Sequence, residues 1–134
     1  MLTLCREMAR DCLALRARRL ERRLTRIYDG ALRGVGVTGS QLSMLIAIAL
    51  LGRATPARLG EELELEKSTV SRNVARLAAA GLVDARDGLR VTARGAATIR
   101  AGHAAWRRAQ HQARSELGTK QLQLLEILSP EDST

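Results

Sequence analysis

The residue types best suited to hold a polyanion gather just after the middle of the chain. Lys67, Arg72 and Arg76 lie there with no acidic residue between them, and Ser68 and Thr69 add two hydroxyl groups. Arginine forks onto phosphate oxygens and onto the O6 and N7 atoms of guanine. Serine and threonine hydroxyls also donate to phosphates. This stretch therefore predicts a surface that binds nucleic acid.

A helix is expected over 67–80, ending at Gly81, and it would place the apolar and the polar residues of this stretch on opposite faces. At about 100° per residue, Val70, Val74 and Leu77 share one face and should pack inward. The opposite face presents hydroxyls in its first turn and then two guanidiniums, which suits a helix that reads base edges. A plain solvated face is the alternative. The residues expected to contact DNA from this helix are Lys67, Ser68, Thr69, Arg72, Arg76 and, at the flank, Asn73.

A helix and a tight turn must position that face. Thr55 is a typical N-cap residue and Pro56 suits the first helical position, so a helix is expected from Pro56 to about Leu63. A turn over 64–66 then leads into the next helix. Two short helices joined in this way form a helix-turn-helix arrangement.

The helix before this motif is expected over 40–51. Thr38 and Gln41 fit a capping box at its start, and its nearly all-round apolar sequence predicts burial. The Gly-rich link over 34–39 matches G-x-G-x-x-G. That motif requires a preceding strand and a βαβ unit, whereas an Arg-rich helix precedes it here, so we reject a nucleotide site.

A β-hairpin is expected after the DNA-reading helix, over 82–92. Asp87-Gly88 between two short alternating segments indicates a two-residue turn in which both residues have positive φ. Arg86 and Arg90 flank its tip, where they could enter the minor groove or bind phosphate. Solvated hairpin charge is the alternative for these two arginines.

Long helices are expected at both ends of the chain, over 2–32, 93–116 and 119–128. Apolar residues recur in them every three or four positions, between arginines and acids. A helix as long as 2–32 exceeds what a small core requires, so part of its apolar stripe should face a partner chain. The predicted fold is mainly α with a small β-hairpin, in one domain over 1–134.

Composition limits the classes of protein that fit. The chain has 134 residues and a net charge of +8, and all but two of its 22 Lys and Arg residues are Arg. A polyanionic partner or a general bias toward arginine explains this charge. The longest apolar run, 44–51, is too short for a membrane span. No secretory signal fits the N-terminal residues, because charged side chains interrupt the apolar stretch that it would need. We expect a cytoplasmic protein without membrane contact.

The sequence resembles the MarR family of winged helix-turn-helix regulators. The segments that carry the resemblance are Leu24–Leu32, Val37–Gln41, Thr55–Leu59, Lys67–Leu77 and Gly81–Val83. The resemblance implies a homodimeric transcriptional regulator, usually a repressor released by a small molecule or an oxidant. It implies that helices 2–32 and 93–128 form the dimer interface and that 40–92 forms the DNA-binding lobe. It also implies that Ser68, Thr69, Ser71, Arg72 and Arg76 face DNA.

Two positions depart from the family pattern. Relatives often carry a longer wing with an Asp-x-Arg tip, whereas the run from Arg86 to Arg90 stands in its place here. The turn of the helix-turn-helix often has glycine where Glu64 stands. A left-handed Glu64 would cost roughly 1 kcal/mol relative to glycine and would bring an acid near the DNA.

The remaining reactive side chains have several interpretations. Cys5 and Cys12 share one helical face, for which core packing is favoured over redox sensing or metal binding. Tyr28 and Trp106, the two aromatic residues, either line an effector pocket or pack in the core or interface. His103 and His111 would need help from another element to hold a metal, so we expect no metal site and no cofactor.

A dimeric, sequence-specific DNA-binding regulator is therefore the preferred function, with double-stranded DNA bearing a pseudo-palindromic operator as its partner. A non-specific architectural DNA-binding protein is the alternative, which would show little sequence preference and a steep dependence on salt. No H-E-x-x-H, G-x-S-x-G or P-loop motif is present, so an enzyme is not expected.

Overall fold

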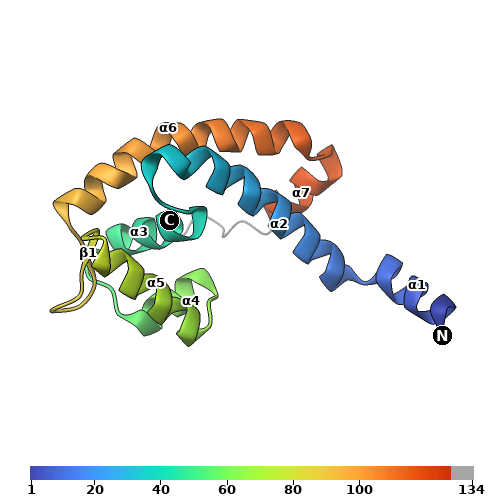
Figure 1. The fold of residues 1–134 in the computed structure, drawn as a ribbon, viewed down its shortest axis with the longest axis horizontal. Helices are drawn as coiled ribbons and strands as arrows, with labels where there is room; N and C mark the ends of the chain where they lie inside the picture. Colours follow the sequence, from blue (N-terminus) through green and yellow to red (C-terminus); the bar gives the residue numbers. More distant parts are fainter. Residues whose placement is uncertain (128–134) are drawn as a thin grey trace.

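The computed structural model describes residues 1–127, which form helices and one small antiparallel sheet (Figure 1). In chain order the elements are α1 (Leu2–Asp11), α2 (Leu13–Leu32), a 3-10 turn (Arg33–Val35), α3 (Gly39–Leu51), α4 (Pro56–Leu63), α5 (Lys67–Ala79), β1 (Val83–Asp84), β2 (Arg90–Val91), α6 (Ala93–Glu116) and α7 (Thr119–Ile127). The predicted class, mainly α with a small β-hairpin in a winged helix-turn-helix, is confirmed. The expected end of the last helix at Leu128 lies outside the described residues.

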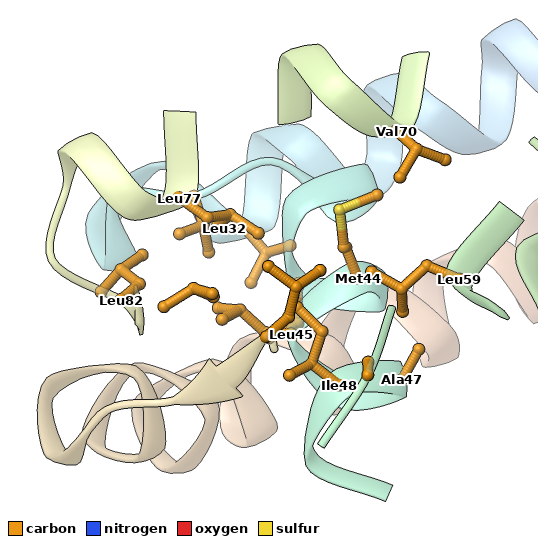
Figure 2. Packing of buried hydrophobic residues seen from close by; sticks show 14 of the residues in the cluster. Leu32, Met44, Leu45, Ala47, Ile48, Leu59, Val70, Leu77 and Leu82 are labelled. Atoms are coloured by element: carbon orange, nitrogen blue, oxygen red, sulfur yellow. The ribbon is translucent and has the colours of Figure 1, made fainter. Parts of the chain in front are cut away.

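Helix α3 lies at the centre of the core, as its apolar sequence predicts. Its Met44, Leu45 and Ile48 are fully buried, and they pack with Leu59 of α4 and Leu77 of α5 (Figure 2). Burying a side chain of this size contributes about 1.5–3 kcal/mol. The surrounding helices are therefore held to α3 by one continuous apolar cluster.

Local sequence signals fix where the short helices begin. The Thr38 side chain accepts from the Gln41 backbone N–H at 3.2 Å, and the Gln41 side chain accepts from the Thr38 N–H at 3.0 Å. The Thr55 hydroxyl accepts from the Arg58 N–H at 3.2 Å, with Pro56 in the first turn. These hydrogen bonds satisfy backbone N–H groups that a helix N-terminus otherwise leaves open. Both predicted caps are confirmed.

The long helices α2 and α6 pack side by side above this core (Figure 1). Helix α6 starts against the hairpin, where a Cβ on Gly95 would lie 2.2 Å from the carbonyl oxygen of Leu82. Only glycine allows that approach. Farther along, Gly102 of α6 lies over Leu42 of α3. Thus α6 connects the hairpin to the far end of the molecule, where α7 turns back.

The predicted single helix over 2–32 is wrong, because the backbone becomes extended at Cys12 (φ −69°, ψ 110°). No residue of α1 is buried, so within one chain no packing aligns α1 with α2. The Arg16 guanidinium donates to the Arg10 carbonyl at 2.8 and 3.1 Å and so satisfies an acceptor that the break releases. In Figure 1, α1 projects from the end of the molecule opposite the hairpin.

The predicted two-residue hairpin turn is also wrong. Strands β1 and β2 pair Val83 with Val91 and Asp84 with Arg90, so the whole stretch 85–89 connects them. Only Gly88 of the expected turn pair has positive φ, at 71°. The physical reason is a contact outside the hairpin. Leu89 pairs through its backbone with Ala54 in the loop after α3, so it is not free to continue β2.

Within residues 1–127, no single helix has the length and apolar content needed to cross a membrane. One pair, Leu13–Val35 with Gly39–Leu51, reaches that content only when its two parts are taken together across a 75° bend. The second part of that pair is the core helix α3.

Candidate nucleic-acid interface

Helix α5 presents a polar, basic face to solvent. Lys67, Ser68, Ser71, Arg72 and Arg76 are exposed, and Thr69 is half-buried. In the part of the chain that the structure describes, none of the three cations forms an ion pair. Their charges are therefore available to an anion.

The inward face of α5 fixes this orientation. Val70 and Leu77 are each 1% exposed, and Val74 is half-buried against the core cluster. Rotating the helix would expose these side chains, which costs the burial energy of each. The rigid core therefore determines which residues of α5 face outward.

Asn73 does not lie at an exposed flank of α5, where the sequence analysis placed it. It is 8% exposed and is the buried polar side chain of the described residues. Asn73 follows Val70 by three positions and precedes Leu77 by four, so helical geometry places it on the buried side. Its amide is not presented to a base edge. The spacing alone could have given this result.

The turn before α5 is strained. Glu64 adopts the left-handed conformation (φ 51°, ψ 47°) and is the one non-glycine residue with positive φ among the described residues. The turn is tight, since the Leu65 N–H donates to the Gly60 carbonyl at 2.9 Å. Glu64 and Glu66 are both exposed beside the start of α5. These two carboxylates put negative charge next to the basic face.

In the hairpin, Arg86 lies in the connection after β1 and is held by the carboxylate of Asp84, the last residue of β1. Its guanidinium donates to Asp84 at 2.6, 3.0 and 3.2 Å, and its backbone N–H donates to the same side chain at 3.0 Å. These hydrogen bonds lower the pKa of Asp84 to about 2. Asp84-Ala85-Arg86 thus has the Asp-x-Arg spacing that the sequence analysis overlooked. Arg90 is exposed and has no ion-pair partner among the described residues.

A second ion pair at the hairpin was not predicted. The Arg53 guanidinium, from the loop after α3, donates to the carboxylate of Asp87 at the hairpin tip. Beside it, the Ala54 N–H and carbonyl exchange hydrogen bonds with Leu89 at 2.9 and 2.8 Å. No local signal predicts this contact, because the paired residues are separated by 34 positions.

The two aromatic residues are not brought into one pocket. Tyr28 lines a cavity of about 170 Å³ between α2, α6 and α7, with Gln110 and Arg114, and its hydroxyl donates to Gln110. Burial raises the pKa of the Tyr28 phenol, with a smaller opposing effect from Arg114. Trp106 lies outside that lining, is 40% exposed and stacks on His103.

The cysteines are not core residues. Cys5 and Cys12 are both exposed free thiols within one chain, so the favoured packing interpretation is wrong for the isolated protomer. Cys5 lies in α1, none of whose residues is buried, and Cys12 lies at the break between α1 and α2. Among residues 1–127, no group of three or more His, Cys, Asp or Glu side chains is placed to hold a metal ion.

A larger open groove, of about 580 Å³, runs between α2 and α6. Ile27 and Ala31 of α2 and the buried Ala109 of α6 line it with apolar surface, and arginines such as Arg23 and Arg108 border it. The sequence analysis did not identify this groove, because its lining comes from residues far apart in the chain.

Comparisons with known proteins agree with the winged helix-turn-helix fold described above. Residues 35–89, from the 3-10 turn to the hairpin tip, match the model of the MarR family. The transcriptional regulator MosR of M. tuberculosis is 28% identical, with a TM-score of 0.77 over 90% of this chain and 93% of that one. No curated protein matches the sequence significantly.

Two further structures were solved with DNA and share the fold. The M. tuberculosis MarR family protein Rv2887 in complex with DNA is 21% identical, with a TM-score of 0.69 over 88% of this chain and 98% of that one. A cysteine-to-serine mutant of E. coli MarR with operator DNA is 20% identical, with a TM-score of 0.76 over 90% and 94% of the two chains.

Proposed function

We propose that this chain, whose residues 35–89 match the model of the MarR family, is a DNA-binding transcription regulator rather than an enzyme, and that it acts as a homodimeric repressor of a specific operator. The operator is a pseudo-palindrome in double-stranded DNA. A small-molecule or oxidant signal releases the dimer from it. The chain acts as one domain, in which 40–92 forms the DNA-binding lobe and the helices α1, α2, α6 and α7 form the dimer interface.

The observation that carries the proposal is the outward face of α5. Lys67, Arg72 and Arg76 are exposed there without ion-pair partners in the described chain, next to the hydroxyls of Ser68 and Ser71. Such a face fits the major groove, with Arg72 and Arg76 directed to guanine edges and phosphates. MosR was also crystallised in complex with DNA, which supports the same use of this fold here.

The dimer is supported by apolar side chains that one chain leaves uncovered. On α1 and the start of α2, Leu4 is 59%, Met8 72% and Leu13 76% exposed, while on α7 Leu124 is 62% and Ile127 77% exposed. Several large exposed apolar side chains on the same terminal helices favour an interaction site, whereas singly scattered ones would not. A second copy that covers these helices would present two α5 helices to successive major grooves, about 34 Å apart.

We place the sites at which the release signal acts on the terminal helices. A small molecule would enter the Tyr28 cavity, and an oxidant would act on the exposed thiols of Cys5 and Cys12. Trp106 stays a candidate for effector contact at its exposed stack with His103. Any effector must bind the DNA-free state more tightly than the DNA-bound state, since only a difference in affinity shifts the equilibrium.

Selection of binding sites from random double-stranded DNA tests the proposal. We expect enrichment of a two-fold-symmetric motif whose half-sites are centred about ten base pairs apart. The Arg72→Ala variant serves as the matched comparison and should lose preference at one position of each half-site. An unenriched pool, bound equally by every sequence, would contradict the proposal and favour the architectural alternative.

A further inference from the structure

The hairpin tip is fastened to the loop after α3 by its backbone. Ala54 and Leu89 exchange two hydrogen bonds, at 2.9 and 2.8 Å, and both residues are buried (1% and 4% exposed). This bridge, with the paired strands β1 and β2, already fixes the position of the tip. The tip therefore needs no side-chain ion pair to hold it in place.

Arg53 nevertheless reaches along the tip to Asp87. Its stem lies so close to Gly88 that a Cβ there would be 2.7 Å from Nε and 2.8 Å from Cγ of Arg53. Because Gly88 has no side chain, there is room for the Arg53 guanidinium to reach the Asp87 carboxylate. The side chain of Arg53 is 55% exposed and that of Asp87 is 77% exposed, so water reaches the whole pair.

An ion pair this exposed stabilises a fold very little. Its stronger effect is local, because it holds a guanidinium in one direction and engages its Nη2 group, which would otherwise be open to a phosphate. Arg86 differs from Arg53, since Asp84, two residues earlier in the chain, binds both its guanidinium and its backbone N–H. The Arg53 pair is held by the side chains alone, which makes it the easier of the two to exchange.

We propose that Arg53 is a DNA-phosphate contact and that Asp87 is its intramolecular competitor, a carboxylate that occupies the phosphate position in the free protein. This inference rests on the proposed function, in which the hairpin meets DNA beside α5. When DNA binds, a backbone phosphate replaces the Asp87 carboxylate on the Arg53 guanidinium. The exchange lowers affinity for every DNA sequence alike, so that base contacts from α5 decide which sites are occupied.

The two residues of the pair should then have opposite effects on binding. The test is fluorescence anisotropy of the full chain on a selected operator and on a scrambled duplex, over a series of salt concentrations. Arg53→Ala should weaken binding to both duplexes by about tenfold, the loss of one charge-assisted phosphate contact, and should reduce the salt slope by about 1. Asp87→Asn should tighten binding to both by roughly threefold, the size of an exposed ion pair.

Three further variants sharpen the result. Arg53→Lys keeps the charge and should recover much of the affinity lost in Arg53→Ala. In the Arg53→Ala background, Asp87→Asn should gain less than it does alone, because the competition no longer exists. Glu21→Gln removes one exposed carboxylate of α2, bonded only to Thr25 in the described chain, and controls for net charge. Thermal unfolding of each variant verifies that the fold is intact.

Each outcome decides the inference. Weaker binding in both Arg53→Ala and Asp87→Asn would overturn it, since the pair would then only support the hairpin. Unchanged binding in both, or an equal gain in Glu21→Gln, would also overturn it while the proposed function stands. A wild-type chain that binds neither the operator nor the scrambled duplex would instead overturn the proposed function, and the inference with it.

Discussion

The carboxylate of Asp84 is bound by Arg86, two residues farther along the same hairpin, with Nη2 at 2.6 Å from Oδ2 and Nε at 3.0 Å from Oδ1. The side chain of Arg86 is 90% exposed, so the pair stands in water at the edge of the sheet. Under the proposed function, we therefore expect Arg86 to meet DNA as one half of an ion pair and Arg90 to meet it as a cation without an ion-pair partner in the described chain.

This pair predicts a titration that NMR can follow. The Arg86 guanidinium, and after it the Arg86 backbone N–H, lower the pKa of Asp84 to about 2 from an ordinary 3.8. Because the folded pKa is lowered, the stabilisation is present above pH 4 and is lost as the pH falls toward 2. In Arg86→Ala the pKa of Asp84 should rise toward its ordinary value, with the backbone bond keeping part of the shift. A pKa that stays near 2 would refute the assigned cause.

Arg72 should contribute to base discrimination. In Arg72→Ala we expect a loss of about 1–3 kcal/mol in binding to the selected operator and a relaxed preference at one base pair, because arginine grips guanine with two hydrogen bonds. Arg33→Ala in the 3-10 turn, also an exposed arginine and outside both the proposed interface and the DNA-binding lobe, is the control and should leave the preference unchanged. Operator affinity equal to wild type in Arg72→Ala would remove this face of α5 from the reading surface.

Glu64→Gly should raise the free energy of unfolding by about 1 kcal/mol. The reason is the left-handed backbone of Glu64, which costs a residue with a Cβ that much relative to glycine. Glu66→Gly is the matched control, since φ there is −62° and glycine only adds freedom to the unfolded chain. Chemical denaturation should show opposite signs for the two variants, and a destabilised Glu64→Gly would contradict the strain argument.

Met8→Glu should convert dimer to monomer. Met8 is 72% exposed on α1, and a carboxylate there would be buried without a partner if α1 packs on a second copy. Sedimentation velocity should show a lower mass at micromolar concentration for Met8→Glu, while Glu61→Gln on α4, an exposed position outside the proposed interface, should remain dimeric. A wild-type chain that sediments as a monomer would contradict the proposed interface.

Local signals in the sequence predicted much of the fold. The capping box of Thr38 and Gln41 and the Thr55-Pro56 start depend on residues within four positions, so their helices begin where predicted. The end of the reading helix at Gly81, with φ of 73°, is equally local. The break at Cys12 could not be predicted in this way, because periodicity continues through it and only packing would keep the helix straight.

The sequence predicted the exposed basic face of α5 and a hairpin carrying Arg86 and Arg90, but it did not predict the ion pair at the hairpin tip. The outward face of α5 follows from residue spacing, although the same spacing should have excluded Asn73. The Arg53–Asp87 pair depends on a tertiary bridge between Ala54 and Leu89, which no pattern along the chain reveals. The separation of Tyr28 from Trp106 likewise depends on how α2 and α6 pack.

The measurement that tests the central claim most directly is the affinity of the dimer for a selected operator against a scrambled duplex of equal length, at two salt concentrations. Sequence-specific reading by α5 predicts an operator preference of about 10³ or more that persists at the higher salt, because base contacts release no counterions. Equal affinity for both duplexes, falling together as salt rises, would contradict the account and leave a non-specific architectural DNA-binding protein.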